Sequence, residues 1–240
     1  FRLDFTQDKR YSISPVTQKV LSYLDGDVYV EIFLDGDLSP DYERLKKSIK
    51  EKLDQFKAYS NTKLEYRFIN PSAEEDKQLR ERGFRLIAQR GLQPKYFLEE
   101  KNGNKTEKFI FPGAIVSYKQ NETPVQFLKG NKVQSDEEQL NQAVEGVEFE
   151  LLKAIRKLSI KEYKTIAIID GHGEPSKENL EDITNSLNEF YAVKRVRLDS
   201  LTALKGVDLA MVIGPKTEYT EKEKFILDQF VVSGGKAFFA

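Results

Sequence analysis

The segment TIAIIDGHGEPSKENL, residues 165–180, decides how the C-terminal part of the chain folds. The stretch TIAIID is almost entirely apolar, which is typical of a strand covered on both faces of a parallel sheet. The glycines of DGHGEP then indicate a tight turn. The apolar residues after the turn recur at helical spacing: Leu180, Ile183, Leu187 and Phe190. A strand, a turn and a helix in this order predict the beginning of a parallel α/β domain.

The rest of the C-terminal part continues in the same pattern. KRVRLD and VDLAMVIG, residues 194–199 and 207–214, are predicted strands, and a helix over residues 220–234 ends at a glycine. KAFFA, residues 236–240, begins a fourth strand. The short links between these elements predict a mostly parallel, doubly wound sheet over residues 161–240. We expect this domain to be incomplete at its C-terminal end, because the chain stops within a predicted strand.

The N-terminal part alternates helices and strands. A short helical lead-in precedes a strand rich in β-branched and aromatic residues at 28–35. A long amphipathic helix then begins at Ser39 and Pro40, an N-cap residue followed by a first-turn proline. A half-buried strand at residues 64–70 and a helix at residues 72–91 follow.

The next segment, residues 95–128, has a different character. Its three apolar stretches are separated by the turn clusters KNGNKT and KQNET, which predicts an antiparallel meander. Ser135 and Glu138 then form a Ser-x-x-Glu capping box that opens the longest helical pattern of the chain. We therefore expect a domain at residues 1–134, a long connecting helix at residues 135–160, and the parallel domain after it.

The order of elements in the N-terminal part resembles a thioredoxin-like α/β domain, with a strand, a helix, a strand, a helix, an antiparallel pair and a closing helix. Pro94 stands before the expected third strand, where thioredoxin-like folds place a cis proline. Redox cysteines would lie within DGDLSPDY, residues 35–42, but the chain contains no cysteine. We therefore expect the shape of this fold without its redox chemistry.

The composition is typical of a globular protein and narrows the classes of function. Lys plus Arg total 38 and Asp plus Glu total 39, so the net charge is -1. This balance argues against nucleic acid as the main partner, since phosphate binding requires a basic surplus, and against simple adhesion to an anionic membrane. The lack of cysteine excludes disulfides, thiolate nucleophiles and cysteine-bound metals. No apolar run approaches the length of a membrane span, no signal peptide is visible, and both ends look like cuts within a longer protein.

The loop DGHGEP carries the main candidate functional residues. It holds the only histidine of the chain. It also lies where parallel sheets commonly bind ligands, because the following helix points free N–H groups there. The predicted third strand ends in a glycine turn that faces the same rim. The candidate binding or contact residues at this rim are Asp170, Gly171, His172, Gly173, Glu174, Gly214 and Pro215.

Three interpretations of this loop compete. A phosphate cradle is disfavoured, because Ser176 stands where the dinucleotide fingerprint requires glycine, no Walker A sequence is present, and Asp170 and Glu174 bring negative charge. A hydrolytic centre would pair His172 with a carboxylate, but there is no cysteine, no G-x-S-x-G elbow and no second histidine for a metal. A tight strand-to-helix turn with Ser176 as the N-cap is favoured. We expect no catalytic residue, metal or cofactor.

Several segments together resemble a known family. They are RLDFTQDKRYSISPVTQKVL, VYVEIFLDGDLSPDYERLKKSIKEKLDQFKAYS, FINP, PGAIVSY and GHGEP. In this order they resemble the gliding-motility-associated ABC transporter auxiliary proteins of Bacteroidetes, the GldG family. The resemblance implies a periplasm-facing region of an inner-membrane protein, anchored through segments outside these residues, that works with a permease and an ATPase. The second domain also resembles flavodoxin and class I glutamine-amidotransferase folds, whose catalytic cysteine has no counterpart here.

These observations lead to one leading hypothesis and two alternatives. The leading hypothesis is a non-catalytic, periplasm-facing component of an ABC transporter complex linked to gliding motility, which acts by protein contacts or cargo sensing. The first alternative is a small-ligand or glycan-binding protein that uses a crevice between the DGHGEP and IGPKTE loops. The second alternative is a hydrolase centred on His172.

Overall fold

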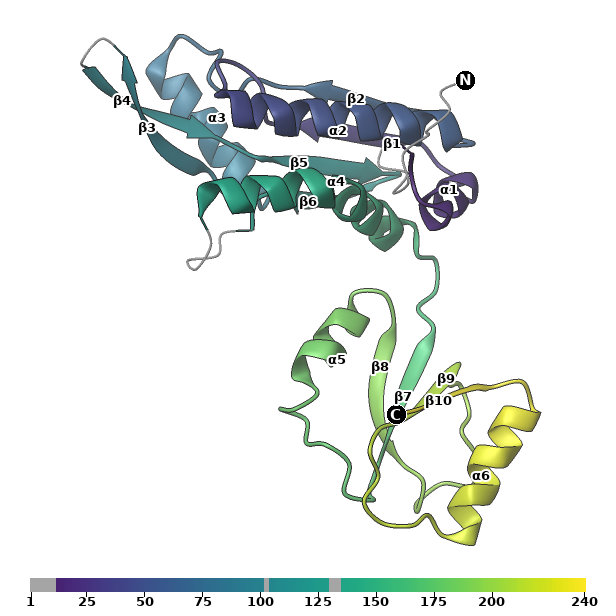
Figure 1. The fold of residues 1–240 in the computed structure, drawn as a ribbon. Helices are drawn as coiled ribbons and strands as arrows, with labels where there is room; N and C mark the ends of the chain where they lie inside the picture. The colour runs from purple at the N-terminus through teal and green to yellow at the C-terminus, as the bar shows by residue number, and fades with distance from the viewer. Residues whose placement is uncertain (1–11, 102–103, 130–134) are drawn as a thin grey trace. The chain divides into compact units, whose positions relative to one another are not determined.

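The structure is a computed structural model that describes residues 12–101, 104–129 and 135–240. The chain forms two compact units, Phe1–Ser159 and Ile160–Ala240, which are described separately below (Figure 1). None of the helices in the described ranges is both long and apolar enough to cross a membrane.

The first unit is built on a mixed four-stranded sheet in the order β2-β1-β5-β6. Strand β1 (Val28–Ile32) pairs in parallel with β2 (Leu64–Phe68) and antiparallel with β5 (Gly113–Tyr118). Strand β6 (Asn121–Gln126) pairs antiparallel with β5. A parallel pair joined to an antiparallel pair through β1 is the arrangement expected of a thioredoxin-like α/β domain, so this part of the predicted fold class is confirmed.

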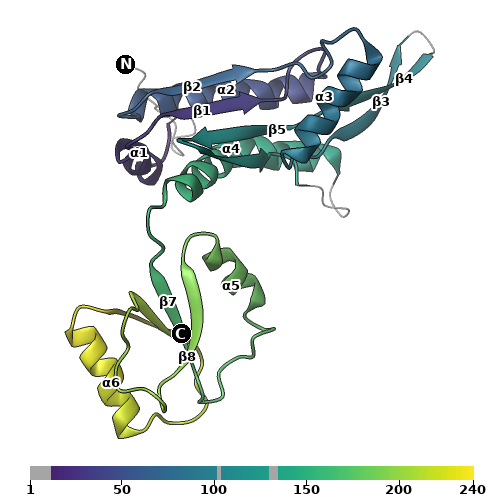
Figure 2. The same ribbon diagram turned by 180° about the vertical axis from the view of Figure 1, so that it is seen from behind.

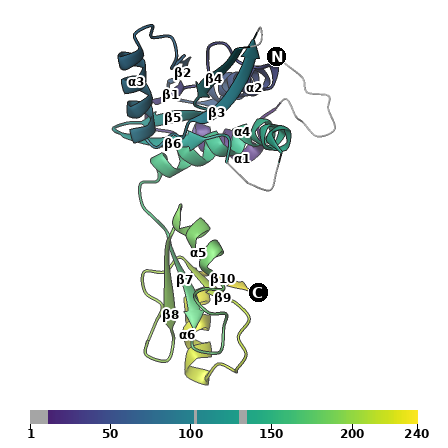
Figure 3. The ribbon, with the colours of Figure 1, turned by 90° about the vertical axis from the view of Figure 1, so that its left-hand side faces the viewer.

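Helices cover both faces of this sheet (Figure 3). Helices α2 (Pro40–Tyr59) and α4 (Asp136–Ser159) pack on one face, and α3 (Lys77–Gln89) packs on the other. Helix α1 (Pro15–Ser22) packs against α2 and α4. The core beneath α2 and α4 contains large side chains with no exposed surface, among them Leu45, Ile49, Leu53, Phe56 and Leu151.

The two predicted helix starts differ in how they are capped. At α4, Ser135 Oγ accepts the Glu138 N–H at 3.2 Å and Glu138 Oε2 accepts the Ser135 N–H at 2.9 Å, which confirms the predicted capping box. At α2, Ser39 occupies the N-cap position and Pro40 the first turn, but the Ser39 side chain makes no capping hydrogen bond. The amphipathic pattern and the proline therefore define the start of α2 without help from a side-chain cap.

The predicted antiparallel meander is wrong in its connectivity. Strands β3 (Lys95–Lys101) and β4 (Asn104–Ile110) form a separate two-stranded ribbon, while β5 and β6 belong to the main sheet. The break falls at Phe111 and Pro112, because Phe111 leaves the ribbon to be buried in the core beneath α3. Pro112 is thus the proline that precedes the antiparallel strand beside β1. The predicted cis bond at Pro94 is also wrong, since no cis peptide occurs in the described residues.

The second unit is built on an all-parallel four-stranded sheet in the order β10-β9-β7-β8. Its strands are β7 (Thr165–Asp170), β8 (Ala192–Arg197), β9 (Leu209–Val212) and β10 (Lys236–Phe239). Strand β7 is central and pairs with both β8 and β9. The order places the strand-end loops of β7 and β9 beside each other, and it confirms the parallel part of the predicted fold class.

Helices α5 (Glu181–Asn188) and α6 (Glu221–Val232) lie on opposite sides of this sheet (Figure 2). Leu187 of α5 packs with one apolar cluster, and Ile226 and Phe230 of α6 pack with the cluster on the other face. The predicted N-cap at Ser176 is wrong: α5 begins at Glu181, one turn later. A turn over residues 176–180 intervenes, in which Ser176 Oγ accepts the Asn179 N–H at 3.4 Å and the Ser176 carbonyl accepts the Leu180 N–H at 3.2 Å.

Candidate functional site

The loops that follow β7 and β9 meet at the carboxyl-terminal rim of the parallel sheet. The carbonyl oxygen of His172 accepts the N–H groups of Lys216 at 2.7 Å and Thr217 at 3.0 Å. Both sequence-predicted loops therefore touch directly, and Gly214 and Pro215 stand exposed beside the contact. The small-ligand alternative requires an open crevice between these two loops, and the hydrogen bonds from Lys216 and Thr217 to His172 lie at that position.

The glycines allow this close approach of the two loops. Gly171 and Gly173 have φ angles of +122° and +82°, a region that L side chains rarely adopt. A Cβ atom on Gly173 would lie 3.1 Å from Cβ of Lys216. Both positions thus favour glycine through their backbone conformation, and a side chain at Gly173 would also crowd Lys216.

The carboxylate of Glu174 folds back onto its own loop. Its Oε2 accepts the N–H groups of Gly171 at 3.0 Å and His172 at 2.6 Å, and its Oε1 accepts the Tyr219 hydroxyl at 3.0 Å. The Glu174 side chain is 0% exposed. Two successive loop amides that would attract an external anion are thus occupied by an internal one. Burial, followed by the hydrogen bond to Glu174, raises the pKa of Tyr219 above its ordinary value, so Tyr219 remains a donor.

His172 is buried between two carboxylates and an aromatic ring. Its Nε2 lies 3.2 Å from Oε2 of Glu223, its Nδ1 lies 3.9 Å from Oε1 of Glu174, and its ring centroid is 4.0 Å from that of Tyr219. Because a carboxylate only accepts, Nε2 is the atom that carries the proton in the neutral ring. Nδ1 is buried without a hydrogen-bond partner in the described part of the chain.

Glu223 ties the histidine to the start of α6. It forms a capping box with Thr220, whose N–H and hydroxyl both donate to Glu223 Oε2, at 2.8 Å and 2.7 Å. Burial raises the pKa of the Glu223 carboxyl, but the Thr220 hydrogen bonds and the neighbouring His172 together outweigh it, so the pKa lies below its ordinary value. Glu223 is therefore held as a buried carboxylate.

Asp170 at the end of β7 pairs with a cation from the adjacent strand. Arg195 of β8 donates to Asp170 Oδ1 at 3.0 Å and to the carbonyl of Pro175 at 3.0 Å. The Arg195 hydrogen bond is the main reason why the pKa of Asp170 lies below its ordinary value. One guanidinium thus anchors both ends of the DGHGEP loop.

Sequence reasoning missed three residues of this site: Arg195, Tyr219 and Glu223. The Thr-x-x-Glu pattern at Thr220 and Glu223 was a readable capping-box signal. The other two carry no local signal, because Tyr219 and Arg195 reach the loop only through strand pairing and the β9–α6 connection.

The site as a whole is a network of internal contacts. The hydroxyls of Tyr219 and Thr220 donate to buried carboxylates, and the His172 ring packs against Tyr219 and is hydrogen-bonded to Glu223. No group of three His, Cys, Asp or Glu residues with metal-binding geometry occurs in residues 12–101, 104–129 and 135–240. This arrangement joins two loops and the start of α6 into one rigid rim.

Comparison with known proteins links the parallel unit to transport. Residues 163–240 match a family described as an ABC-type uncharacterized transport system, which supports an ABC transporter auxiliary family for this chain. Residues 7–117 match a domain of unknown function, DUF7088. No curated protein and no solved structure matches the chain. The transport-family match covers the whole rim described above.

Proposed function

We propose that this chain is a non-catalytic, periplasm-facing part of an ABC transporter complex linked to gliding motility, and that it acts through protein contacts. The observation that carries the proposal is the match of residues 163–240 to the ABC-type transport family. The resemblance of the segments in both units to gliding-motility auxiliary proteins supports the finer assignment.

The closed rim supports a role without catalysis. A general base must reach a substrate proton directly or through one water, but the Nε2 of His172 faces the buried Glu223 and its ring packs against the Tyr219 ring. The loop amides are satisfied by Glu174. The groups that would act on a substrate instead rigidify the loop.

The same closure leaves a preformed surface for a protein partner. Gly171, Gly214, Pro215 and Lys216 are exposed at the rim while the residues beneath them are locked. A rigid surface loses little conformational entropy on binding. We therefore propose that this rim contacts the permease.

Site-specific photo-crosslinking in native membranes tests the proposal. A photoreactive amino acid replaces Lys216 at the rim of the full-length protein, and a matched variant carries it at Lys205, an exposed lysine on the loop between β8 and β9. We expect adducts with the permease subunit from position 216 and not from position 205. Absence of permease adducts from position 216 would contradict the proposed contact.

A reporter fusion tests the proposed location. Alkaline phosphatase, which folds only outside the cytoplasm because it needs disulfides, is fused after this region in the full-length protein. We expect an active phosphatase. An inactive fusion that is present at normal abundance would contradict the periplasmic assignment. The crosslinking experiment tests the transporter contact independently of this result.

A further inference from the structure

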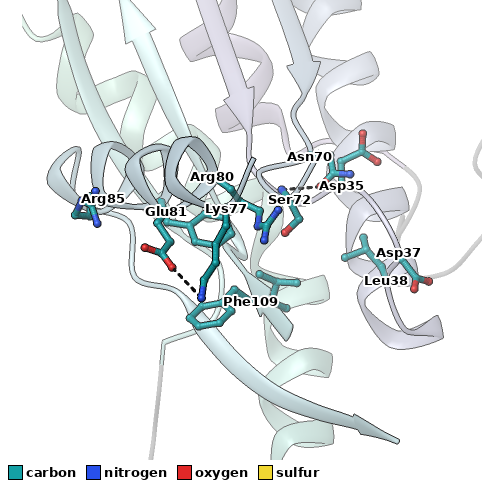
Figure 4. A pocket seen from close by; sticks show the side chains of 12 residues that line it. Asp35, Asp37, Leu38, Asn70, Ser72, Lys77, Arg80, Glu81, Arg85 and Phe109 are labelled. Carbon is teal, nitrogen blue, oxygen red and sulfur yellow. Dashed lines mark hydrogen bonds and ion pairs between the residues drawn. The ribbon is translucent and has the colours of Figure 1, made fainter. Parts of the chain in front are cut away.

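The first unit contains a cavity of about 650 Å³ at the carboxyl-terminal ends of the parallel strands β1 and β2 (Figure 4). This edge of a parallel pair is where α/β proteins commonly bind ligands. The loops after the two strands, helix α3 and the end of β4 form its walls. Its lining residues are Asp35, Asp37, Leu38, Asn70, Ser72, Lys77, Arg80, Glu81, Phe84, Arg85, Phe109 and Ile110.

Helix α3 makes one wall of the cavity basic. It contributes Lys77, Arg80 and Arg85 to the lining, and its one acidic lining residue, Glu81, lies 4.0 Å from the Lys77 ammonium. Arg80 Nη1 donates to the carbonyls of Glu74 at 2.7 Å and Glu75 at 3.2 Å. These two contacts hold the guanidinium in place and use one nitrogen, so the other side of its fork remains for a carboxylate. Figure 4 shows Arg80 in the middle of the cavity beside Ser72.

Aromatic rings form a second wall. Phe84 of α3 stacks on Phe109 with ring centroids 5.6 Å apart, and Tyr96 meets Phe109 edge-on at 4.6 Å. Phe84 and Phe109 are both half-buried. The pair thus leaves apolar surface beside the basic wall, which suits a ligand with an apolar group next to an anionic one.

The wall opposite α3 is closely packed where the loops after β1 and β2 meet. Gly36 has a φ angle of +110°, and a Cβ atom on it would lie 2.8 Å from the side-chain amide of Asn70. Asp35 is paired with Lys46 at 2.7 Å, so its charge is already balanced. Asp37 adds a further carboxylate to the lining, and Figure 4 shows Asp37 and Arg85 at opposite ends of it, with Arg80 between them. In the described residues Arg80 donates to backbone carbonyls only, so it is the cation that can attract an anion to the middle of the cavity.

We propose that this cavity binds a peptide segment that carries one carboxylate next to an aromatic or large aliphatic side chain. Arg80 pairs with the carboxylate, and the apolar side chain packs on Phe84 and Phe109. The carboxylate is either the free C-terminus of a peptide or an acidic side chain. This site lies in the first unit and does not depend on the transport-family match of the second, so it extends beyond the proposed function.

Titration of the isotope-labelled 240-residue chain, followed by backbone amide NMR, tests the proposal with three small probes. N-acetyl-phenylalanine offers a terminal carboxylate, N-acetyl-aspartyl-phenylalaninamide offers an acidic side chain, and N-acetyl-phenylalaninamide offers none. We expect saturable shifts at α3 and residues 69–72 with at least one acidic probe, at a millimolar Kd typical of a ligand of this size. Which acidic probe binds more tightly identifies the source of the carboxylate. Equal binding of the neutral amide, or no shifts with any probe, would overturn the proposal.

Matched variants on α3 separate this site from general electrostatic attraction. Arg80→Gln removes the guanidinium in the middle of the lining, and Arg82→Gln removes an exposed cation of the same helix that does not line the cavity. We expect Arg80→Gln to weaken binding of the acidic probe about 5-fold or more, as loss of a charge-assisted contact does, and Arg82→Gln to leave it within about 1.5-fold, as weak surface charges do. Equal weakening by the two variants would overturn the proposed site.

Discussion

Replacement of Glu174 by alanine tests whether the DGHGEP loop is locked by its own carboxylate. The side chain accepts hydrogen bonds from the Gly171 amide, the His172 amide and the Tyr219 hydroxyl. The Gly171 amide has a second acceptor, Asp170 Oδ1 at 3.1 Å, so two donors lose the acceptor that the structure shows. A hydrogen bond to a charged group contributes about 1.5–3 kcal/mol, so Glu174→Ala is expected to destabilise the second unit by about 3–6 kcal/mol.

This loss is large relative to the stability of a unit of this size. The free energy of unfolding of a domain is roughly 0.05–0.15 kcal/mol per residue, which amounts to about 4–12 kcal/mol for the second unit. Hydrogen exchange with mass spectrometry on the whole chain measures the effect unit by unit. Peptides from β7 and β9 should exchange at least about 100-fold faster, since each 1.4 kcal/mol is tenfold. Peptides from β1 and β5 should exchange at the wild-type rate.

Two further variants separate the hydrogen bonds from the loss of a side chain. Glu174→Gln keeps the shape and replaces charge-assisted bonds by neutral ones, so we expect a smaller loss, of about 1–3 kcal/mol. Glu218→Ala removes an exposed carboxylate of the same rim and should change stability by less than about 0.5 kcal/mol. If Glu174→Ala increases exchange in β7 and β9 no more than Glu218→Ala does, the proposed lock is refuted.

Three other perturbations probe the remaining parts of the chain. The pKa of Glu223 in the folded protein lies below the ordinary 4.5, so its carboxylate stabilises the fold above that pH and this contribution is lost as the pH falls. The difference in unfolding free energy between wild type and Glu223→Gln should therefore shrink from pH 5 to pH 3. A difference that stays constant in urea titrations would disprove this. Gly146→Ala, in the middle of α4 with nothing within 4 Å of the new Cβ, should raise the melting temperature of the first unit by stabilising it about 0.5–1 kcal/mol, and a decrease in calorimetry would count against it. Phe56 is 0% exposed, so Phe56→Ala should lower the unfolding free energy of the first unit by about 3–5 kcal/mol in chemical denaturation. Hydrogen exchange of the second unit should stay unchanged. A loss of unfolding free energy below about 1 kcal/mol would contradict the assigned core.

Much of the fold could be predicted from local patterns in the sequence. The apolar run TIAIID and the short links after it led to a parallel sheet, because a strand covered on both faces has no polar positions. The capping box of Ser135 and Glu138 marked the start of α4, since it satisfies orphan amides within one turn. The glycines of the DGHGEP loop likewise predicted a tight turn, and their positive φ angles confirm it.

Contacts between distant segments were settled only by the tertiary fold. His172 and Glu223 are 51 residues apart along the chain, and they meet because β9 pairs with β7 and returns α6 to the same rim. The ribbon of β3 and β4 separates from the main sheet for a similar reason: Phe111 is drawn into the core beneath α3. Periodicity along a chain reports which face of an element is apolar. It does not report which other element will cover that face, because that choice depends on the packing of the whole unit.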